Sequence, residues 1–211
     1  MKKIAFSVGL LLMIAAIAVA LRAPLKDAAY DKLTQEMFVS ADTDAFDPGP
    51  ELDSYFPGLN ARYQGRDVRL LDDFAGENGT VFLAVRSVDW CPYCMRQVAE
   101  LQQHKAAYDA AGLGVVAITY DAPELQQAFV EKQGIEFPLL QDVDALTFKT
   151  LGILNEKYAP GEDNYGIPHP GMIVVDAGGV VRGKLFVEAY SSRVDALSSL
   201  AYAKGVLGLA P

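Results

Sequence analysis

The apolar and polar positions after about residue 59 follow patterns typical of strands that alternate with helices. Residues 80–85 form an unbroken apolar run, which predicts a central strand buried on both faces, and residues 114–120 predict a second one. Further strands are expected over residues 59–64, 68–71, 135–140, 172–175 and 180–188. Helices are expected over residues 92–111, 121–134, 143–151 and after Ser191 or Ser192. This order predicts an α/β fold in which helices flank a mixed central sheet.

Turn and cap residues place some of the boundaries. Residues 65–67 and 177–179 are expected to be turns, the second of them within a hairpin. Asp121 begins a sequence that has the form of a capping box, and Gly134 is suited to end the same helix. The polar residues 155–166 predict an exposed loop beside the active site.

A different pattern precedes this domain. After Lys2 and Lys3, residues 4–21 are uncharged and mostly apolar, with no polar face. As a helix this run rises about 27 Å, near the lower limit for spanning a bilayer, and residues 18–20 also suit a signal peptidase. We therefore expect residues 1–22 to be a hydrophobic helix that serves as a signal peptide or membrane anchor. Residues 23–58 are expected to be a tether, and residues 59–211 the α/β domain.

The two N-terminal lysines also predict a location. They are expected to keep the N-terminus in the cytoplasm, so that the domain lies outside it, in the periplasm or at the cell surface, either anchored or secreted. Contact with the membrane is expected through residues 4–21 if this segment is not cleaved. The formal net charge of −9 argues against nucleic acid as a partner, and 51% hydrophobic residues exclude a disordered chain.

The chemistry is concentrated in Trp90-Cys91-Pro92-Tyr93-Cys94, which contains both cysteines of the chain. The segment lies where a strand is expected to run into a helix, so backbone N–H groups and the helix dipole favour the thiolate of Cys91. Cys94, one turn later, is expected to stay protonated until it attacks a mixed disulfide. The sequence therefore predicts a redox-active Cys91–Cys94 disulfide that needs no separate cofactor.

Two other interpretations of the cysteine pair are weaker. A structural disulfide closing so small a ring removes little chain entropy, and a zinc site lacks further ligands, since only His104 and His169 are available.

Arg86 is expected either to stabilise the Cys91 thiolate or to pair with Asp89 at a solvent-facing strand end.

Four segments resemble the alkyl hydroperoxide reductase/thiol-specific antioxidant (AhpC/TSA, peroxiredoxin-like) superfamily of redoxins: residues 65–70, 86–94, 137–142 and 166–176. The resemblance extends over about residues 59–200 and implies a thioredoxin-like fold. It also implies that Pro170 follows a cis peptide bond beside the disulfide, and that the loop of His169 and Pro170 forms a substrate-binding edge opposite Trp90 and Cys91. The residues expected to support the cysteines are Trp90, Pro92, Tyr93, Arg86, His169 and Pro170.

Departures from the family pattern shape the functional prediction. Peroxiredoxins resemble one another in a proline and a hydroxyl residue before the reactive cysteine, where this chain has Ala84 and Val88, and Ser87 is one residue out of register. We therefore expect an extracytoplasmic thiol–disulfide oxidoreductase, with protein thiols or disulfides and an electron-donor or electron-acceptor redox protein as partners. A thiol peroxidase that reduces hydroperoxides is the alternative. A copper-binding metallochaperone using the two cysteines and His169 is less expected, because copper-delivery relatives of this fold space their cysteines by three residues.

Overall fold

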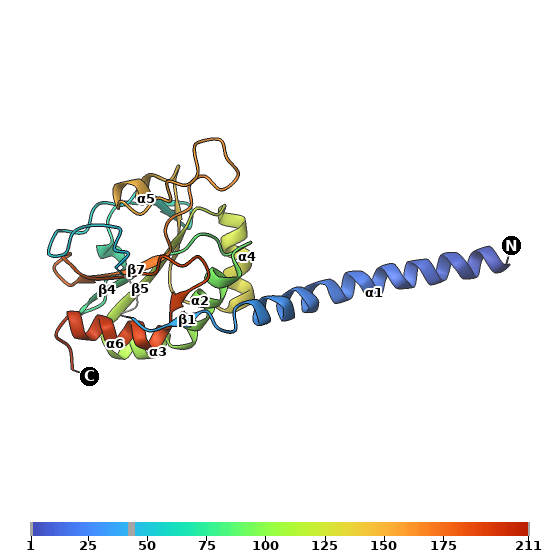
Figure 1. Ribbon diagram of the computed structural model, residues 1–211, viewed down its shortest axis with the longest axis horizontal. Helices are drawn as coiled ribbons and strands as arrows, with labels where there is room; N and C mark the ends of the chain where they lie inside the picture. Colours follow the sequence, from blue (N-terminus) through green and yellow to red (C-terminus); the bar gives the residue numbers. More distant parts are fainter. Residues whose placement is uncertain (1, 42–44, 211) are drawn as a thin grey trace. The chain divides into compact units, whose positions relative to one another are not determined.

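The computed structural model describes residues 2–41 and 45–210, and the chain divides into two compact units, residues 1–36 and 37–211. The first unit is helix α1 (Lys2–Leu33; Figure 1), which continues through part of the expected tether. The side chains of residues 1–12, 14–16, 18 and 23 lie outside the described part. The signal peptide or membrane anchor therefore stays a prediction. Among the described residues, none of the helices combines the length and the apolar character needed to cross a membrane.

The second unit is built on a mixed sheet, as predicted. One group of strands has the order β3 (Arg66–Val68), β2 (Ala61–Tyr63), β6 (Leu139–Asp142), β5 (Leu113–Thr119), and the other has the order β4 (Gly79–Ala84), β7 (Gly171–Asp176), β8 (Val181–Phe186). The two groups meet where Val85 N donates to Ile118 O at 3.1 Å. Strands β5 and β6 are parallel, whereas β7 is antiparallel to both β4 and β8. Strand β4 is thus a central strand, as its apolar sequence predicted.

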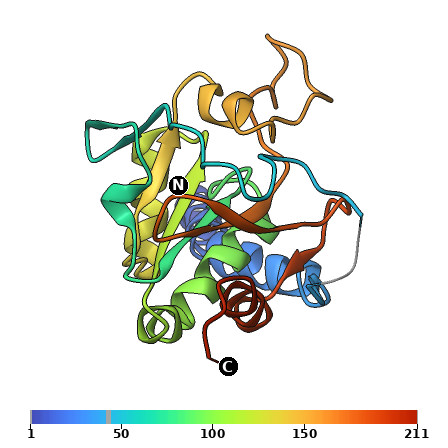
Figure 2. The same ribbon diagram turned by 90° about the vertical axis from the view of Figure 1, so that its left-hand side faces the viewer.

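Alternate side chains of the central strands enter two separate hydrophobic clusters. Val81 and Leu83 of β4 belong to the cluster that includes side chains of α2 (Pro92–Gln103), α3 (Lys105–Ala110), α4 (Pro123–Gln133) and α6 (Ala196–Val206). Phe82 of β4 belongs to the other cluster, together with Phe148 of α5 (Leu146–Thr150). Figure 1 shows α5 across the sheet from α3 and α6, and Figure 2 shows the same separation after a quarter turn. Helices therefore flank the sheet, as predicted.

Several predicted boundaries are wrong, each because of a local hydrogen bond or turn. The expected helix over 92–111 is interrupted at His104, whose backbone leaves the helical region (φ −105°, ψ 5°). The cap of α6 is Asp195, which accepts from Ser198 N at 2.8 Å, rather than Ser191 or Ser192. The first turn is Gln64-Gly65, because both residues have positive φ (49° and 75°), as two-residue hairpins require.

Part of the expected tether lies against the domain. Strand β1 (Phe38–Val39) pairs in parallel with β9 (Arg193–Val194), and further along the chain Asp53 N donates to Val181 O at 2.9 Å. Phe56 also packs edge-on against Phe82, with ring centroids 5.2 Å apart.

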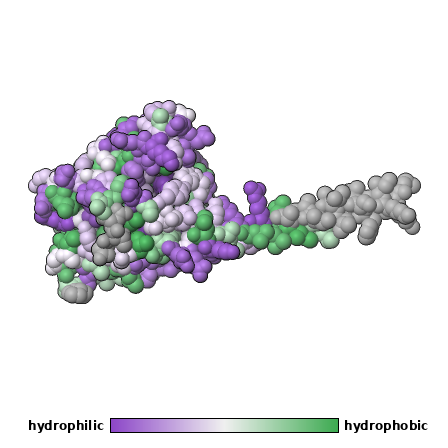
Figure 3. All heavy atoms as spheres, in the orientation of Figure 1, coloured by the Kyte–Doolittle hydropathy of each residue, from purple (hydrophilic) through white to green (hydrophobic). Residues whose placement is uncertain are grey.

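The 3₁₀ helix η1 (Asp72–Phe74) precedes β4. Residues 155–166 form the predicted exposed loop, drawn in orange at the upper right of Figure 2. On the face of the domain drawn in Figure 3, most of the surface is hydrophilic.

Asp142, at the end of β6, is a buried carboxylate that holds the start of α5. It accepts from Thr147 N at 2.8 Å and from Phe148 N at 3.2 Å. Burial is the largest influence on this group, and it raises the pKa of Asp142 to about 6, although the two hydrogen bonds oppose the rise. Asp142 therefore binds a proton more readily in the folded chain than in the unfolded chain.

We expect this shift to make the domain less stable as the pH rises from about 4 to about 6. The folded pKa lies above the unfolded value, so the favourable contribution is present at low pH and is lost as the folded carboxyl ionises. The largest change consistent with this shift is about 3 kcal/mol. Chemical denaturation of wild type and Asp142→Asn across this pH range measures it, since the amide does not titrate. A difference in unfolding free energy between the two proteins that stays constant with pH would contradict the assignment.

Candidate active site

Cys91 lies at the junction between the loop that follows β4 and helix α2. It is the N-cap residue of α2 (φ −95°, ψ 99°), Pro92 occupies the first turn, and Cys94 N donates to Cys91 Sγ at 3.3 Å. The structure thus places Cys91 at the helix start that the sequence predicted. The N–H group of Cys94 and the positive end of the helix dipole both stabilise negative charge on the Cys91 sulfur.

The two cysteines form a disulfide whose Cα atoms are 5.3 Å apart. Both residues are fully buried, with 0% of their surface exposed, and Trp90, Pro92 and Tyr93 beside them are half-buried. The predicted pairing is therefore present. A reaction partner can reach Cys91 only if neighbouring side chains move aside.

A buried carboxylate fixes the loop that leads to Cys91. Asp121, at the end of β5, accepts from Ser87 Oγ at 2.8 Å and from Val88 N at 2.7 Å. The Ser87 hydroxyl oxygen in turn accepts from Asp89 N at 3.0 Å and from Trp90 N at 3.2 Å. The predicted capping box is wrong for this reason, because Asp121 binds the active loop and leaves Ala122 as the N-cap of α4 without a side-chain bond. Burial raises the pKa of Asp121, and these hydrogen bonds oppose the rise.

Two aromatic side chains, Trp90 and Tyr93, pack against the hydrophobic cluster that contains both cysteines. Trp90 Nε1 donates to the hydroxyl of Tyr120 at 2.9 Å, which holds the indole in one orientation. Tyr93 packs edge-on against Tyr190, with ring centroids 6.1 Å apart. Tyr190 is 59% exposed and lies in the segment that precedes α6. This pair of tyrosines therefore includes one ring that faces solvent.

Arg86 does not lie at a solvent-facing strand end, so that expectation is wrong. Only 2% of its surface is exposed, and its Nη2 donates to the carbonyl oxygen of Tyr190 at 2.6 Å. The guanidinium carbon also lies 3.7 Å from the centroid of the Tyr190 ring. Burial lowers the pKa of Arg86, and the Tyr190 ring opposes that effect. Within the described residues, its hydrogen bonds do not include either sulfur or Asp89. Arg86 therefore holds the segment that contains Tyr190.

Arg193 is a site residue that sequence analysis missed. Its exposed fraction is also 2%, and its Nη2 lies 3.5 Å from Cys94 Sγ, within hydrogen-bond distance. Its Nη1 donates to the carbonyl oxygens of Tyr190 and Ser192. Burial, with a further contribution from Arg86, lowers the pKa of Arg193 to about 9, so the group is still positively charged at neutral pH. The one signal in the sequence was a basic residue within the helix expected after Ser191 or Ser192.

The peptide bond between His169 and Pro170 is trans, so the predicted cis bond is wrong; none of the described peptide bonds is cis. The physical reason is pairing with residues 153–155. His169 N donates to Ile153 O at 2.7 Å, and Asn155 N donates to Ile167 O at 2.9 Å, which keeps this stretch extended up to β7. Both His169 and Pro170 are half-buried, and their role in binding a partner stays a prediction.

His169 does not join the cysteines in a metal site. Its ring packs edge-on against Phe46 at 5.0 Å, and burial lowers its pKa. In the described part of the chain, no group of three or more His, Cys, Asp or Glu side chains is arranged to hold a metal ion. The ligand set expected for copper delivery is therefore not assembled among these residues.

Comparison with known proteins gives consistent matches. Residues 54–184 match the AhpC/TSA family. A putative peroxiredoxin of Haemophilus influenzae, named bcp, is 29% identical over 112 residues, which cover 53% of this chain and 71% of that protein. Peroxiredoxin Bcp of Escherichia coli K12 is 31% identical over 111 residues, or 53% of this chain and 69% of that protein. A putative peroxiredoxin of Mycobacterium tuberculosis is 32% identical over 98 residues, with 46% of this chain and 62% of that protein covered.

Solved structures share the fold. Reduced Prx3 of Vibrio vulnificus in complex with hydrogen peroxide has a TM-score of 0.63 at 20% identity, over 73% of this chain and 99% of that one. A peroxiredoxin-like protein of Aquifex aeolicus has a TM-score of 0.62 at 17% identity, over 76% of this chain and 90% of that one. Since the family match covers more than half of the chain and includes both cysteines, the chain belongs to the AhpC/TSA family.

Proposed function

We propose that this chain is a thiol-dependent peroxidase that reduces hydroperoxides through Cys91 and Cys94. The observation that carries the proposal is a disulfide formed at the start of α2 in a family whose named relatives are peroxiredoxins. The residues before Cys91, Ala84 and Val88, favoured disulfide exchange over peroxide reduction on the sequence alone. The names of the relatives favour the opposite order, and we adopt it here.

The geometry accommodates a complete reaction. The Cys91 thiolate attacks one peroxide oxygen, the O–O bond breaks, and the other oxygen leaves with a proton as water or an alcohol, which leaves Cys91 as a sulfenic acid. Cys94 Sγ then attacks the Cys91 sulfur, and the hydroxyl group takes up a proton and leaves as water while the disulfide forms. Because Cys94 is one helical turn away, this second step needs no large rearrangement of the chain. A dithiol redox protein restores the two thiols by exchange.

Thiol–disulfide exchange with protein substrates is the second candidate, and a specific observation favours it. Next to the position of the hydroxyl residue in peroxiredoxins, this chain has Ser87, whose hydroxyl already donates to Asp121 and accepts from two backbone N–H groups. Val88, at the family position itself, has no hydroxyl and is buried. The two candidates differ only in what first oxidises Cys91.

The N-terminal segment supports a proposal about location. We propose that the domain acts outside the cytoplasm, because Lys2 and Lys3 precede the apolar residues 4–21. Sequencing the N-terminus of the mature protein from its native host measures the fate of this segment. Retention of Lys2 indicates an anchor, and a mature chain that begins at Leu21 indicates a cleaved signal peptide. Recovery of the full-length chain from the soluble cytoplasmic fraction would overturn the location.

We expect hydrogen peroxide or an alkyl hydroperoxide to oxidise the reduced protein faster than a protein disulfide does, because the helix start activates Cys91 for either oxidant and a small peroxide needs less opening of the buried site. Stopped-flow measurement of Trp90 fluorescence, checked by thiol counting, follows both reactions. Protein lacking both cysteines is the control for changes unrelated to the disulfide. Faster oxidation by the protein disulfide would reverse the order of the two candidates.

The two cysteine variants are expected to stop the reaction at different points. Cys91→Ser should lose peroxide reduction completely, because no thiolate remains at the start of α2. Cys94→Ser should react once and accumulate the Cys91 sulfenic acid, since the resolving thiol is absent. Mass spectrometry after trapping with a sulfenic-acid reagent measures this product. The role assignment is wrong if Cys91→Ser reacts with peroxide and Cys94→Ser does not.

A further inference from the structure

Two buried arginines near the disulfide have no acidic partner among the residues that the structure describes. Arg86 and Arg193 are each 2% exposed, and among the described residues neither forms an ion pair. Their Nε atoms are buried without any hydrogen-bond partner, and their other bonds end mainly on the carbonyl oxygen of Tyr190. Burying a charge without a counter-ion is unfavourable, so any state of the protein that brings a negative charge here is stabilised.

The sulfur of Cys94, which contacts Arg193, can change its charge in the redox reaction. Arg193 Nη2 lies 3.5 Å from Cys94 Sγ, whereas its remaining bonds go to carbonyl oxygens, which stay neutral. In the disulfide the Cys94 sulfur is also neutral, so Arg193 has no counter-ion within the described part of the chain. Reduction can place a full negative charge on that sulfur.

We propose that Arg193 is the counter-ion of the Cys94 thiolate and thereby makes Cys94 the preferred leaving sulfur when the disulfide is reduced. This inference rests on the part of the proposed function in which Cys91 and Cys94 form the redox couple, and it holds for either oxidant. Arg86 is a positioning residue in this arrangement. It stacks on Tyr190 and binds the same carbonyl oxygen as Arg193, which fixes the segment that presents Arg193.

The reduction has balanced steps. A thiolate of the reducing dithiol attacks Cys91 Sγ, the bond between the two sulfurs breaks, and its electron pair goes to Cys94 Sγ, which leaves as a thiolate beside Arg193. The second thiol of the reductant then loses its proton to solvent. The resulting thiolate attacks the reductant's first sulfur, which is bonded to Cys91 in the mixed disulfide. Cys91 leaves as a thiolate, and the reductant departs as a disulfide. Two electrons have passed to the cysteine pair.

Each sulfur thus has its own stabilising group. Cys91 accepts from the N–H group of Cys94 at the start of α2, and Cys94 receives a fixed cation from the segment that precedes α6. A cation within hydrogen-bond distance stabilises a thiolate more than a thiol or a disulfide. Arg193 therefore shifts the equilibrium toward the dithiol form and makes the disulfide easier to reduce.

The test is the equilibrium of the Cys91–Cys94 couple in glutathione buffers, measured on the full chain by thiol labelling. Arg193→Met and Arg193→Gln remove the charge, and the glutamine retains a hydrogen-bond donor for the carbonyl oxygens. We expect both variants to be about tenfold harder to reduce, which corresponds to a potential about 30 mV more negative. Arg193→Lys should recover most of the difference, since it keeps the charge.

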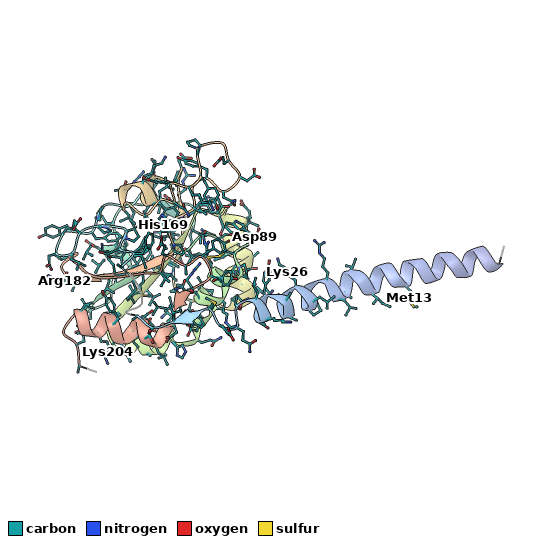
Figure 4. All side chains as sticks on the ribbon, viewed as in Figure 1. Met13, Lys26, Asp89, His169, Arg182 and Lys204 are labelled. Carbon is teal, nitrogen blue, oxygen red and sulfur yellow. A yellow bond between two sulfur atoms is a disulfide. The ribbon has the colours of Figure 1, made fainter. Side chains whose placement is uncertain are left out.

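Arg182→Met is the matched control. Arg182 is exposed and pairs with Asp53 and Asp176. Figure 4 shows it on the opposite side of the domain from Asp89, which precedes Cys91 by two residues. Its loss should leave the equilibrium unchanged. Folded Arg193→Met and Arg193→Gln proteins with the wild-type equilibrium would overturn the proposal. A protein without peroxidase turnover whose equilibrium still shifts with Arg193 would overturn only the proposed function.

A second measurement keeps Arg193 in place, in case its neutral variants do not fold. In Cys91→Ser protein Cys94 is the only thiol, so thiolate absorbance at neutral pH, compared with the protein lacking both cysteines, reports its charge. Among the residues described, the charged and titratable groups that act on this site are Arg86, Tyr93, Tyr190 and Arg193. We expect thiolate absorbance. Its absence in the folded protein would overturn the proposal.

Discussion

The buried carboxylate of Asp121 fixes the position of the active loop, and the rest of the site depends on it. It joins the end of β5 to Ser87 Oγ and Val88 N, in the loop that follows β4. A buried carboxylate is costly unless it is hydrogen-bonded, and here the loop supplies the partners. The same bonds carry the chain toward Cys91 in the extended conformation needed for a helix N-cap. The start of α2 is therefore set by a contact between residues far apart in the sequence.

This constraint also decides which polar groups remain for chemistry. Because the Ser87 hydroxyl binds Asp121 and two backbone N–H groups, it belongs to the scaffold of the loop. Positive charge comes instead from Arg86 and Arg193, whose burial leaves them with carbonyl oxygens and a sulfur as partners. The site thus stabilises negative charge on sulfur, whereas a hydroxyl donor beside Cys91 is missing among the residues described.

Apolar patterns predicted the sheet well because each central strand alternates between two buried clusters, as Val81 and Phe82 of β4 do. The position of Cys91 at the start of α2 could also be predicted, since proline and helical spacing are local signals. The role of Asp121, the burial of Arg86 and the trans bond before Pro170 could not. Each depends on a partner distant in the sequence, such as Tyr190 for Arg86 or Ile153 for His169. Arg193 was missed for the same reason, because nothing local indicates its approach to Cys94.

The site separates two properties that act on the same pair of sulfurs. The loop that follows β4 contains the Ser87 hydroxyl, which is already hydrogen-bonded, and under the proposed function this loop governs the choice of oxidant. The segment at residues 190–193 contacts Cys94 through Arg193, and in the proposed mechanism Cys94 is the sulfur released when the disulfide is reduced. Under the two proposals, a change at Ser87 or Val88 is expected to act on the choice of oxidant, and a change at Arg193 on the redox equilibrium. Arg86 belongs to the first segment by sequence but to the second by its contacts, since it binds Tyr190. The proposals thus assign reduction of the disulfide to the buried charge of Arg193, and oxidation of Cys91 to a loop whose hydroxyl is held by Asp121.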